Sequence, residues 1–127
     1  MVYKSNLPVL IYSLLFILID QGIKKIVYNY LPTLIVFNYH GAWGIIPSWM
    51  SVIGLVGLIW IILYKKVYSI PYILILSGGI SNIIDRFIYQ AVVDFIHIWI
   101  FPVFNIADIY IMIGVLVWLT QEFFNHD

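Results

Sequence analysis

Four long apolar segments dominate this sequence and restrict what it can fold into. They run from about Leu7 to Val27, from Ser48 to Tyr64, from Ile70 to Phe87 and from Asn105 to Phe123. A helix needs roughly 20 apolar residues to cross a bilayer, because each residue adds about 1.5 Å towards a hydrocarbon core of about 30 Å. The segment lengths therefore predict four transmembrane helices, of which the second is the shortest.

The amino-acid composition leads to the same interpretation. Of the 127 residues, 64% are hydrophobic and only 9% are charged, whereas a soluble domain carries about 25% charged residues. A water-soluble domain of this size could not bury so much apolar surface. We expect an all-α integral membrane protein that forms a single domain over residues 1–127.

The two longer connections, residues 28–47 and 88–104, are apolar, β-branched and aromatic. Within them, residues 33–37 and 92–96 are predicted to form short strands at the membrane surface, because β-branched and aromatic residues favour strands. A turn is expected over Asn38–Gly41. The sequence thus predicts four helices with a small β-rich surface element.

Orientation follows from the distribution of the basic residues. They divide into Lys4, Lys65 and Lys66 on one side and Lys24, Lys25 and Arg86 at or near the other. Lys24 and Arg86 each have an acid nearby and count for less. Both termini are therefore expected in the cytoplasm, with the strand-bearing connections outside. No small-residue cleavage site follows the first segment, so we expect a retained helix.

Several site chemistries find no support in the sequence. The net charge is zero and there is no cysteine, so neither a nucleic-acid partner nor thiolate chemistry is expected. His40, His97 and His126 lack zinc-site spacing, and no Gly-x-Ser-x-Gly elbow or phosphate loop is present. We expect no metal and no organic cofactor.

Four of the six acids lie in or beside the apolar segments: Asp20, Asp85, Asp94 and Asp108. An ionisable residue in such a context is costly and points to a functional site by default. Asp20 stands four residues before Lys24, the favoured order for a helical ion pair. Because we expect no second carboxylate near Asp20 and a cation is at hand, a structural role is expected for this pair.

The third segment carries Asn82, Asp85 and Arg86 after a run of small residues. Small residues allow helices to approach closely. Two interpretations of Asp85 remain open, a functional carboxylate or an ion pair with Arg86 at the interface. For Asn82 and Arg86, binding of a polar backbone or carbonyl group is at least as good an explanation.

The last two acids suggest a catalytic pair. Asn105 and Asp108 fit a helix cap followed by an acid in the first turn, whereas Asp94 stands isolated in an apolar strand, where an unpaired carboxylate is penalised. We expect Asp94 and Asp108 to face each other. Such a pair shares a proton, so that one carboxylate activates water and the other acts as acid. The helix dipole favours ionised Asp108, which leaves the proton on Asp94.

Taken in order along the chain, these residues resemble the motifs of the lipoprotein signal peptidase, or signal peptidase II, family. The resembling segments are Asp20-Gln21 with Lys24, Asn38 to Gly44, Ser77-Gly78 through Asn82-Ile83-Ile84-Asp85-Arg86, Val92 to Phe95, and Phe104 to Asp108. The chain departs from the family at His40, Gln90, Ser77 and Ser81, which stand where glycine is usual, and in a shorter segment after Asp94. These departures concern the shape of the substrate loop more than the chemistry.

The resemblance implies an enzyme of the bacterial cytoplasmic membrane that cuts before a diacylglyceryl-modified cysteine near the outer face. Asp94 and Asp108 would be its catalytic dyad. The residues implied to contact the substrate backbone or the inhibitor globomycin are Asn38, Asn82, Arg86 and Asn105, and Asp20, Lys24 and Asp85 would be structural. The implied partners are lipid-modified prolipoproteins, globomycin-type inhibitors and membrane lipids.

Two alternatives remain. A small transporter or proton-relay protein would need acids spread across the depth of the membrane, whereas most of the four lie towards one face. A catalytically inactive interaction subunit is disfavoured because both acids of the pair are present.

Overall fold

The computed structural model describes residues 7–41, 46–65 and 69–125. Their elements in chain order are α1 (Leu7–Tyr30), the 3-10 helix η1 (Pro32–Leu34), β1 (Val36–Asn38), α2 (Ser48–Lys65), α3 (Ile70–Tyr89), β2 (Val92–Asp94) and α4 (Ile106–Phe124). The fold is mostly helical, as expected. The largest difference from the predicted helix bounds is at the end of α1, which continues to Tyr30 instead of ending near Val27.

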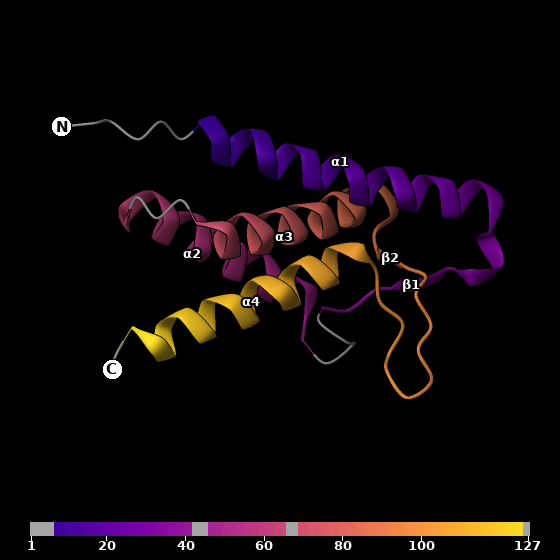
Figure 1. The fold of residues 1–127 in the computed structure, drawn as a ribbon. Helices are drawn as coiled ribbons and strands as arrows, with labels where there is room; N and C mark the ends of the chain where they lie inside the picture. The colour runs from indigo at the N-terminus through magenta and orange to yellow at the C-terminus, as the bar shows by residue number, and fades with distance from the viewer. Residues whose placement is uncertain (1–6, 42–45, 66–68, 126–127) are drawn as a thin grey trace.

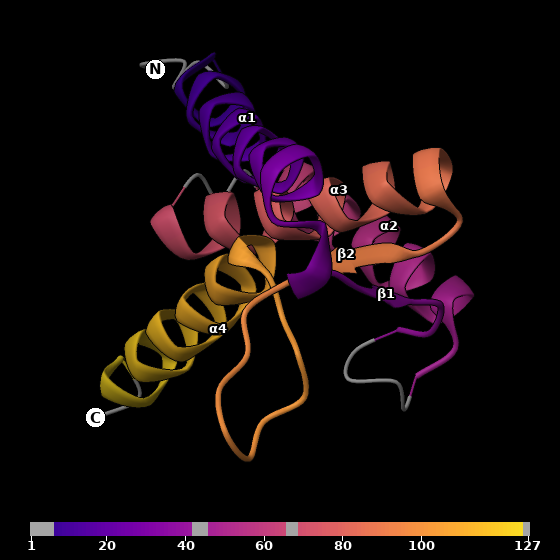
Figure 2. The same ribbon diagram turned by 90° about the vertical axis from the view of Figure 1, so that its right-hand side faces the viewer.

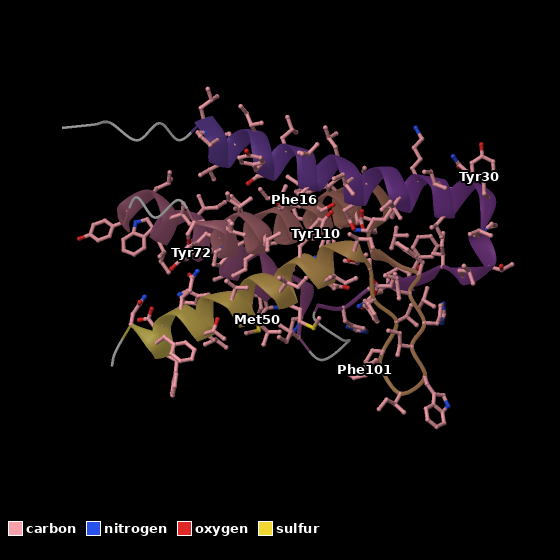
Figure 3. All side chains as sticks on the ribbon, viewed as in Figure 1. Phe16, Tyr30, Met50, Tyr72, Phe101 and Tyr110 are labelled. Carbon is pink, nitrogen blue, oxygen red and sulfur yellow. The ribbon has the colours of Figure 1, made fainter. Side chains whose placement is uncertain are left out.

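The helices run along a common direction, with the start of α1 and the end of α4 on one side and the two strands on the other (Figure 1). α3 lies among the other three helices and packs against α1, α2 and α4, as the end-on view makes clear (Figure 2). α1 and α4 meet at the edge-to-face rings of Phe16 and Tyr110, whose centroids are 5.0 Å apart (Figure 3). The buried or cavity-lining polar residues Lys24, Asn82, Asp85 and Asp108 lie towards the strand-bearing end.

The two strands form an antiparallel sheet in which Val36 pairs with Asp94 and Asn38 with Val92. The first strand starts later than predicted, because Pro32 opens a 3-10 turn that takes up residues 33 and 34. Proline suits the first position of a helical turn, since its φ is preset and it has no N–H to leave unpaired. The second strand ends at Asp94, earlier than predicted.

Burial in this molecule is reversed relative to a soluble protein. Large apolar side chains are exposed along α1, α2 and α4, whereas the buried residues include Asp20, Lys24, Asp85 and Asp94. Among the described residues, α1 and α4 are long and apolar enough to cross a membrane, and α2 contains a shorter apolar stretch, Trp49–Tyr64. An apolar exterior over a polar interior is the arrangement expected where lipid replaces water as the solvent.

Two glycines allow α3 and α4 to approach closely. A Cβ added at Gly78 would collide with the carbonyl oxygen of Ala107 and lie 2.7 Å from Cγ1 of Ile111, and one at Gly114 would lie 2.8 Å from the carbonyl oxygen of Pro71. Real Cβ atoms do not approach other atoms this closely, so both positions require glycine. The close contact places the end of α3 beside the start of α4, where the candidate site lies.

Candidate active site

A buried lysine of α1 joins two carboxylates from different helices. The Nζ atom of Lys24 lies 2.8 Å from Oδ2 of Asp20 and 2.6 Å from Oδ2 of Asp85. The predicted Asp20–Lys24 pair is therefore confirmed. The expectation that Asp20 has no second carboxylate nearby was wrong, because α3 brings Asp85 to the same ammonium group. Asp85 accordingly pairs with Lys24 rather than with its neighbour Arg86.

Both oxygens of each acid accept hydrogen bonds from other groups, and Oδ2 of each acid does so in addition to its contact with Lys24. Asp20 accepts from the backbone N–H of Ala107 at 2.8 Å and from the hydroxyl of Ser81 at 2.6 Å. Asp85 accepts from the backbone N–H of Val93 at 3.1 Å and from the side chain of Gln21 at 2.8 Å. We refer to Lys24, Asp20 and Asp85 as the lysine cluster. It connects α1 and α3 to β2 and to the first turn of α4.

Sequence reasoning did not assign Gln21 and Ser81 to this cluster. The signal for Gln21 was its place in the segment Asp20-Gln21, which resembles a motif of the family. Ser81 had been noted merely as a departure from a usual glycine, yet its hydroxyl donates to Asp20 and it also accepts from Gln21 at 2.9 Å. The serine therefore adds hydrogen bonds that glycine could not make.

Asn82 links the lysine cluster to Asp108. Its Oδ1 accepts from Nζ of Lys24 at 3.2 Å and from Nδ2 of Asn105 at 3.0 Å. Because two donors converge on this oxygen, the amide nitrogen faces the opposite way, where it donates to Oδ1 of Asp108 at 3.0 Å. The orientation of the Asn82 amide is thus set by Lys24 and Asn105.

Asn105 caps α4, and the cap positions the second carboxylate. Its Oδ1 accepts from the N–H of Asp108 at 2.9 Å, and Oδ2 of Asp108 accepts from the N–H of Asn105 at 3.0 Å. This reciprocal capping box confirms the predicted cap. Since Oδ1 is engaged, the amide nitrogen is left to donate to Oδ1 of Asp94 at 2.8 Å.

Asp94 and Asp108 line the same cavity, which has a volume of about 740 Å³. Asn38, Asn82 and Arg86 line it as well, whereas Asn105 is fully buried behind the two acids. The residues of the lysine cluster do not line the cavity. The rest of the wall is largely apolar and comes from α2, α3 and α4, including Met50, Leu55, Leu58, Ile75, Ile111, Val115 and Leu116.

The Asp94 carboxyl keeps its proton to a higher pH than an ordinary aspartate does. Burial, followed by the neighbouring charge of Asp108, raises the pKa of Asp94 to about 7, against the opposing effect of hydrogen bonds from Asn38 and Asn105 and of the Lys24 charge. Its side chain is only 2% exposed. Two neighbouring carboxyl groups that hold one proton near neutral pH can act as general acid and general base.

Arg86 reaches over the cavity from α3. Its Nη1 donates to the carbonyl oxygen of Asn82 at 3.4 Å and its Nη2 to that of His40 at 3.3 Å. Its Nε is buried and has no hydrogen-bond partner within the described residues. The backbone N–H of His40 donates to Oδ1 of Asn38 at 3.0 Å, which forms the turn predicted there, and the imidazole of His40 is exposed.

Some residues used in the sequence argument cannot be placed. Lys4, Lys66 and His126 lie outside the described residues, as do residues 42–44 of the turn motif. Over the ranges 7–41, 46–65 and 69–125, no three His, Cys, Asp or Glu side chains gather as they would around a metal ion. The polar side chains that line the cavity are two carboxylates, two amides, one guanidinium and the hydroxyl of Ser51.

Comparison with known proteins gave a family and two similar structures. The family model described as signal peptidase (SPase) II matches residues 12–124. A bacterial membrane enzyme solved by the in meso method at 2.3 Å resolution is 24% identical, with a TM-score of 0.76 over 94% of this chain and 90% of that one. Another, solved by the same method at 1.9 Å, is 25% identical, with a TM-score of 0.72 over 90% and 91% of the two chains.

Proposed function

Because this chain belongs to the signal peptidase II family, we propose that it is an aspartic endopeptidase that removes signal peptides from bacterial prolipoproteins. Its substrates would carry a diacylglyceryl-modified cysteine directly after the cleaved bond. The observation that carries the proposal is the placement of Asp94 and Asp108 on one largely apolar cavity. Each carboxylate receives a hydrogen bond from an asparagine whose orientation is set by its neighbours.

The reaction would be a direct attack of water on the scissile peptide bond. Ionised Asp108 takes a proton from the water, and the oxygen adds to the carbonyl carbon of the substrate. Protonated Asp94 then gives its proton to the amide nitrogen as the C–N bond breaks, which leaves a new carboxyl group and a new amine. The raised pKa of Asp94, about 7, supports its role as the proton donor.

The cavity suits a peptide that carries acyl chains. Its apolar wall would take the hydrophobic part of the signal peptide or the lipid, because apolar surfaces associate when both leave water. Arg86 lines the cavity and would donate to a substrate carbonyl through its guanidinium group. Asn38 lies on the same wall and would contact the substrate backbone.

We further propose that all four helices cross the bacterial cytoplasmic membrane as a single domain, with both termini in the cytoplasm. Support comes from α3, which is not among the described helices that are apolar enough to cross a membrane by themselves but packs against the other three and runs along the same direction (Figures 1 and 2). Enclosure by protein allows a helix with Asn82, Asp85 and Arg86 to lie within a bilayer.

A transporter or proton relay is the alternative function. It would need a path of ionisable groups along the depth of the membrane. Here Asp20, Asp85, Asp94 and Asp108 belong to hydrogen-bond networks that meet at Asn82 and Lys24. Because these groups gather at the strand-bearing end of the bundle, the arrangement favours a site over a path.

Cleavage of a synthetic lipid-modified prolipoprotein peptide by the purified protein in vesicles tests the proposed function. Asp94→Asn and Asp108→Asn should each lower the rate by about 10²–10⁴-fold, because the amide keeps the volume but cannot transfer the proton. Glu122→Gln also replaces a carboxylate with an amide, but at the far end of α4, and this variant should cleave at the wild-type rate. Near-normal turnover by either aspartate variant, in folded protein, would rule out the dyad.

The same assay examines inhibition. If globomycin-type inhibitors take the place of the peptide in the cavity, globomycin should raise KM and leave kcat unchanged. Arg86→Ala should weaken both substrate and inhibitor, because hydrogen bonds from charged donors contribute about 1.5–3 kcal/mol. Inhibition that lowers kcat alone would place the inhibitor elsewhere.

A further inference from the structure

The connection between Asp94 and Asp108 carries an unusual apolar surface. Four consecutive large side chains are open to the surroundings: Ile98 at 50%, Trp99 at 100%, Ile100 at 79% and Phe101 at 61% exposure. We refer to residues 98–101 as the apolar tip. Between residues 95 and 104 the sequence contains no Asp, Glu, Lys or Arg. In water, such a tip would leave a large apolar area unfavourably solvated.

The tip is held by an ordered frame. Ile96 and Phe104 form an antiparallel bridge with backbone hydrogen bonds of 2.8 and 3.2 Å, and the N–H of Phe101 donates to the carbonyl oxygen of Ile98 at 2.9 Å. The His97 ring lies within hydrogen-bond distance, 2.7 Å, of the carbonyl oxygen of Leu34. The exposure of the tip is therefore built into the loop by these contacts.

The loop lies at the level where a membrane span ends. α4 has 19 residues, which at about 1.5 Å per residue gives roughly the thickness of a hydrocarbon core. Its N-terminal end would therefore lie at the boundary of that core. The loop leaves the bundle at this end and projects sideways, across the direction of the helices (Figure 1), with Phe101 on the projecting part (Figure 3).

We propose that the apolar tip is an interfacial anchor that inserts into the boundary between lipid headgroups and acyl chains. Three observations favour lipid as its partner. α1 and α4 also expose large apolar side chains, the tip contains tryptophan, which prefers this boundary, and the loop has no charged residue to pair with a protein. Because the loop joins Asp94 directly to the cap of α4, the anchor holds both carboxylates at the level of the membrane surface.

The depth of the tip can be measured directly. The chain has no cysteine, so Trp99→Cys can carry a single environment-sensitive fluorophore in protein reconstituted into vesicles. Asn125→Cys, an exposed polar position, provides the water reference, and Ile113→Cys in the middle of α4 provides the deep reference. Quenchers are iodide on both sides of the membrane and lipids with a nitroxide either near the headgroup or near the bilayer midplane.

We expect the label at position 99 to be quenched most strongly by the nitroxide near the headgroup. Iodide should quench it about fivefold less than at position 125, because interfacial groups lie about 5–10 Å within the boundary. Iodide quenching equal to that at position 125 would place the tip in water and overturn the proposal. Protection from both iodide and lipid nitroxides would mean that protein covers the tip, and protection only after addition of lipidated peptide would mean that substrate does. Either result also overturns it.

A second variant tests the consequence for the site. Ile100→Asp should bring iodide quenching at position 99 close to the water reference. If the proposed peptidase function holds, this variant should cleave lipidated peptide about tenfold more slowly than wild type in vesicles and equally fast in detergent, where no bilayer sets the depth. If the variant cleaved as fast as wild type in vesicles as well as in detergent, that result would contradict the positioning effect. A wild-type protein without any cleavage would refute the peptidase function and leave the depth measurement intact.

Discussion

Asn82 and Asn105 have identical side chains, yet each serves a different carboxylate because its neighbours orient its amide differently. Lys24 and Asn105 occupy the oxygen of Asn82 and direct its nitrogen to Asp108, whereas the helix cap occupies the oxygen of Asn105 and directs its nitrogen to Asp94. Sequence spacing identified both asparagines as polar groups near the site. It could not identify their partners, because these lie on other elements and an amide looks the same in either orientation.

The raised pKa of Asp94 leads to a prediction about pH. If protonated Asp94 donates the proton, kcat/KM should fall as the pH rises through about 7, where the carboxyl loses that proton. The hydrogen bond from Asn38 stabilises the ionised form and lowers this pKa. Asn38→Ala removes the bond, so the pKa should rise and the descending limb of the pH–rate profile should move to higher pH.

Ser51→Ala serves as the matched control for this shift. Ser51 lines the same cavity but is not among the groups that perturb Asp94. Its profile should keep the wild-type limb even if binding weakens. A limb that stays in place in Asn38→Ala, or moves to lower pH, would show that Asp94 does not control the alkaline side of the profile.

The lysine cluster predicts an order of stabilities. Lys24→Met removes the ammonium and leaves the buried Asp20 and Asp85 without their cation, which should cost about 3–5 kcal/mol of unfolding free energy. Asp20→Asn leaves Lys24 paired with Asp85 and disturbs one hydrogen-bond acceptor, which should cost about 1–3 kcal/mol. Denaturant unfolding in detergent measures both. We expect Asp20→Asn to keep most of its activity per folded molecule.

The reverse order, with Asp20→Asn less stable than Lys24→Met, would mean that Lys24 does not compensate the two acids. A stable Asp20→Asn protein without activity would give Asp20 a role in the reaction itself. Both outcomes can be distinguished from a loss of dyad function, because the Asp94 and Asp108 variants should remain folded.

At the scale of elements, helices were easier to predict than strands. The apolar segments are too long for any element other than a helix, so the predicted helix bounds lie close to the observed ones. The strand predicted at residues 33–37 began late because Pro32 favoured a 3-10 turn, a local effect that outweighed β propensity. The contribution of α2 to the cavity wall could not be predicted, because its apolar residues differ little in sequence from those that face outwards.

The contact between α3 and α4 gives a prediction with an internal control. Gly78→Ala would force a methyl group against the carbonyl oxygen of Ala107 and the side chain of Ile111, and overpacking of this kind costs about 1–3 kcal/mol. Gly57→Ala on α2 has no atom within 4 Å of the added carbon and should be neutral or slightly stabilising, because alanine favours helix over glycine. Thermal unfolding in detergent compares them. Equal stability of the two variants would show that the contact tolerates separation.

For the whole molecule, the distribution of polar groups matters more than any one of them. The hydrogen-bond networks of the site collect at the strand-bearing end, while α1 starts and α4 ends at the other (Figure 1). The family and the apolar exterior indicate a membrane protein. A peptidase of this kind would therefore have its site near one face of the bilayer, and the orientation of the chain decides which face that is.

Cysteine labelling in intact cells tests that orientation, because the native chain offers no competing thiol. Ser69→Cys lies just before α3, at the end of the bundle where α1 starts and α4 ends, and Tyr39→Cys lies just after β1, at the opposite end. If both termini are cytoplasmic, a membrane-impermeant maleimide added outside should label position 39 and reach position 69 only after the cells are opened. Ile113→Cys, in the middle of α4, should resist the reagent in both cases, because a thiolate does not form readily within hydrocarbon. The opposite pattern at positions 39 and 69 would place Asp94 and Asp108 at the cytoplasmic face. A lipoprotein peptidase acting near the outer face could not work from there, since its carboxylates would be separated from the scissile bond by the full thickness of the hydrocarbon core.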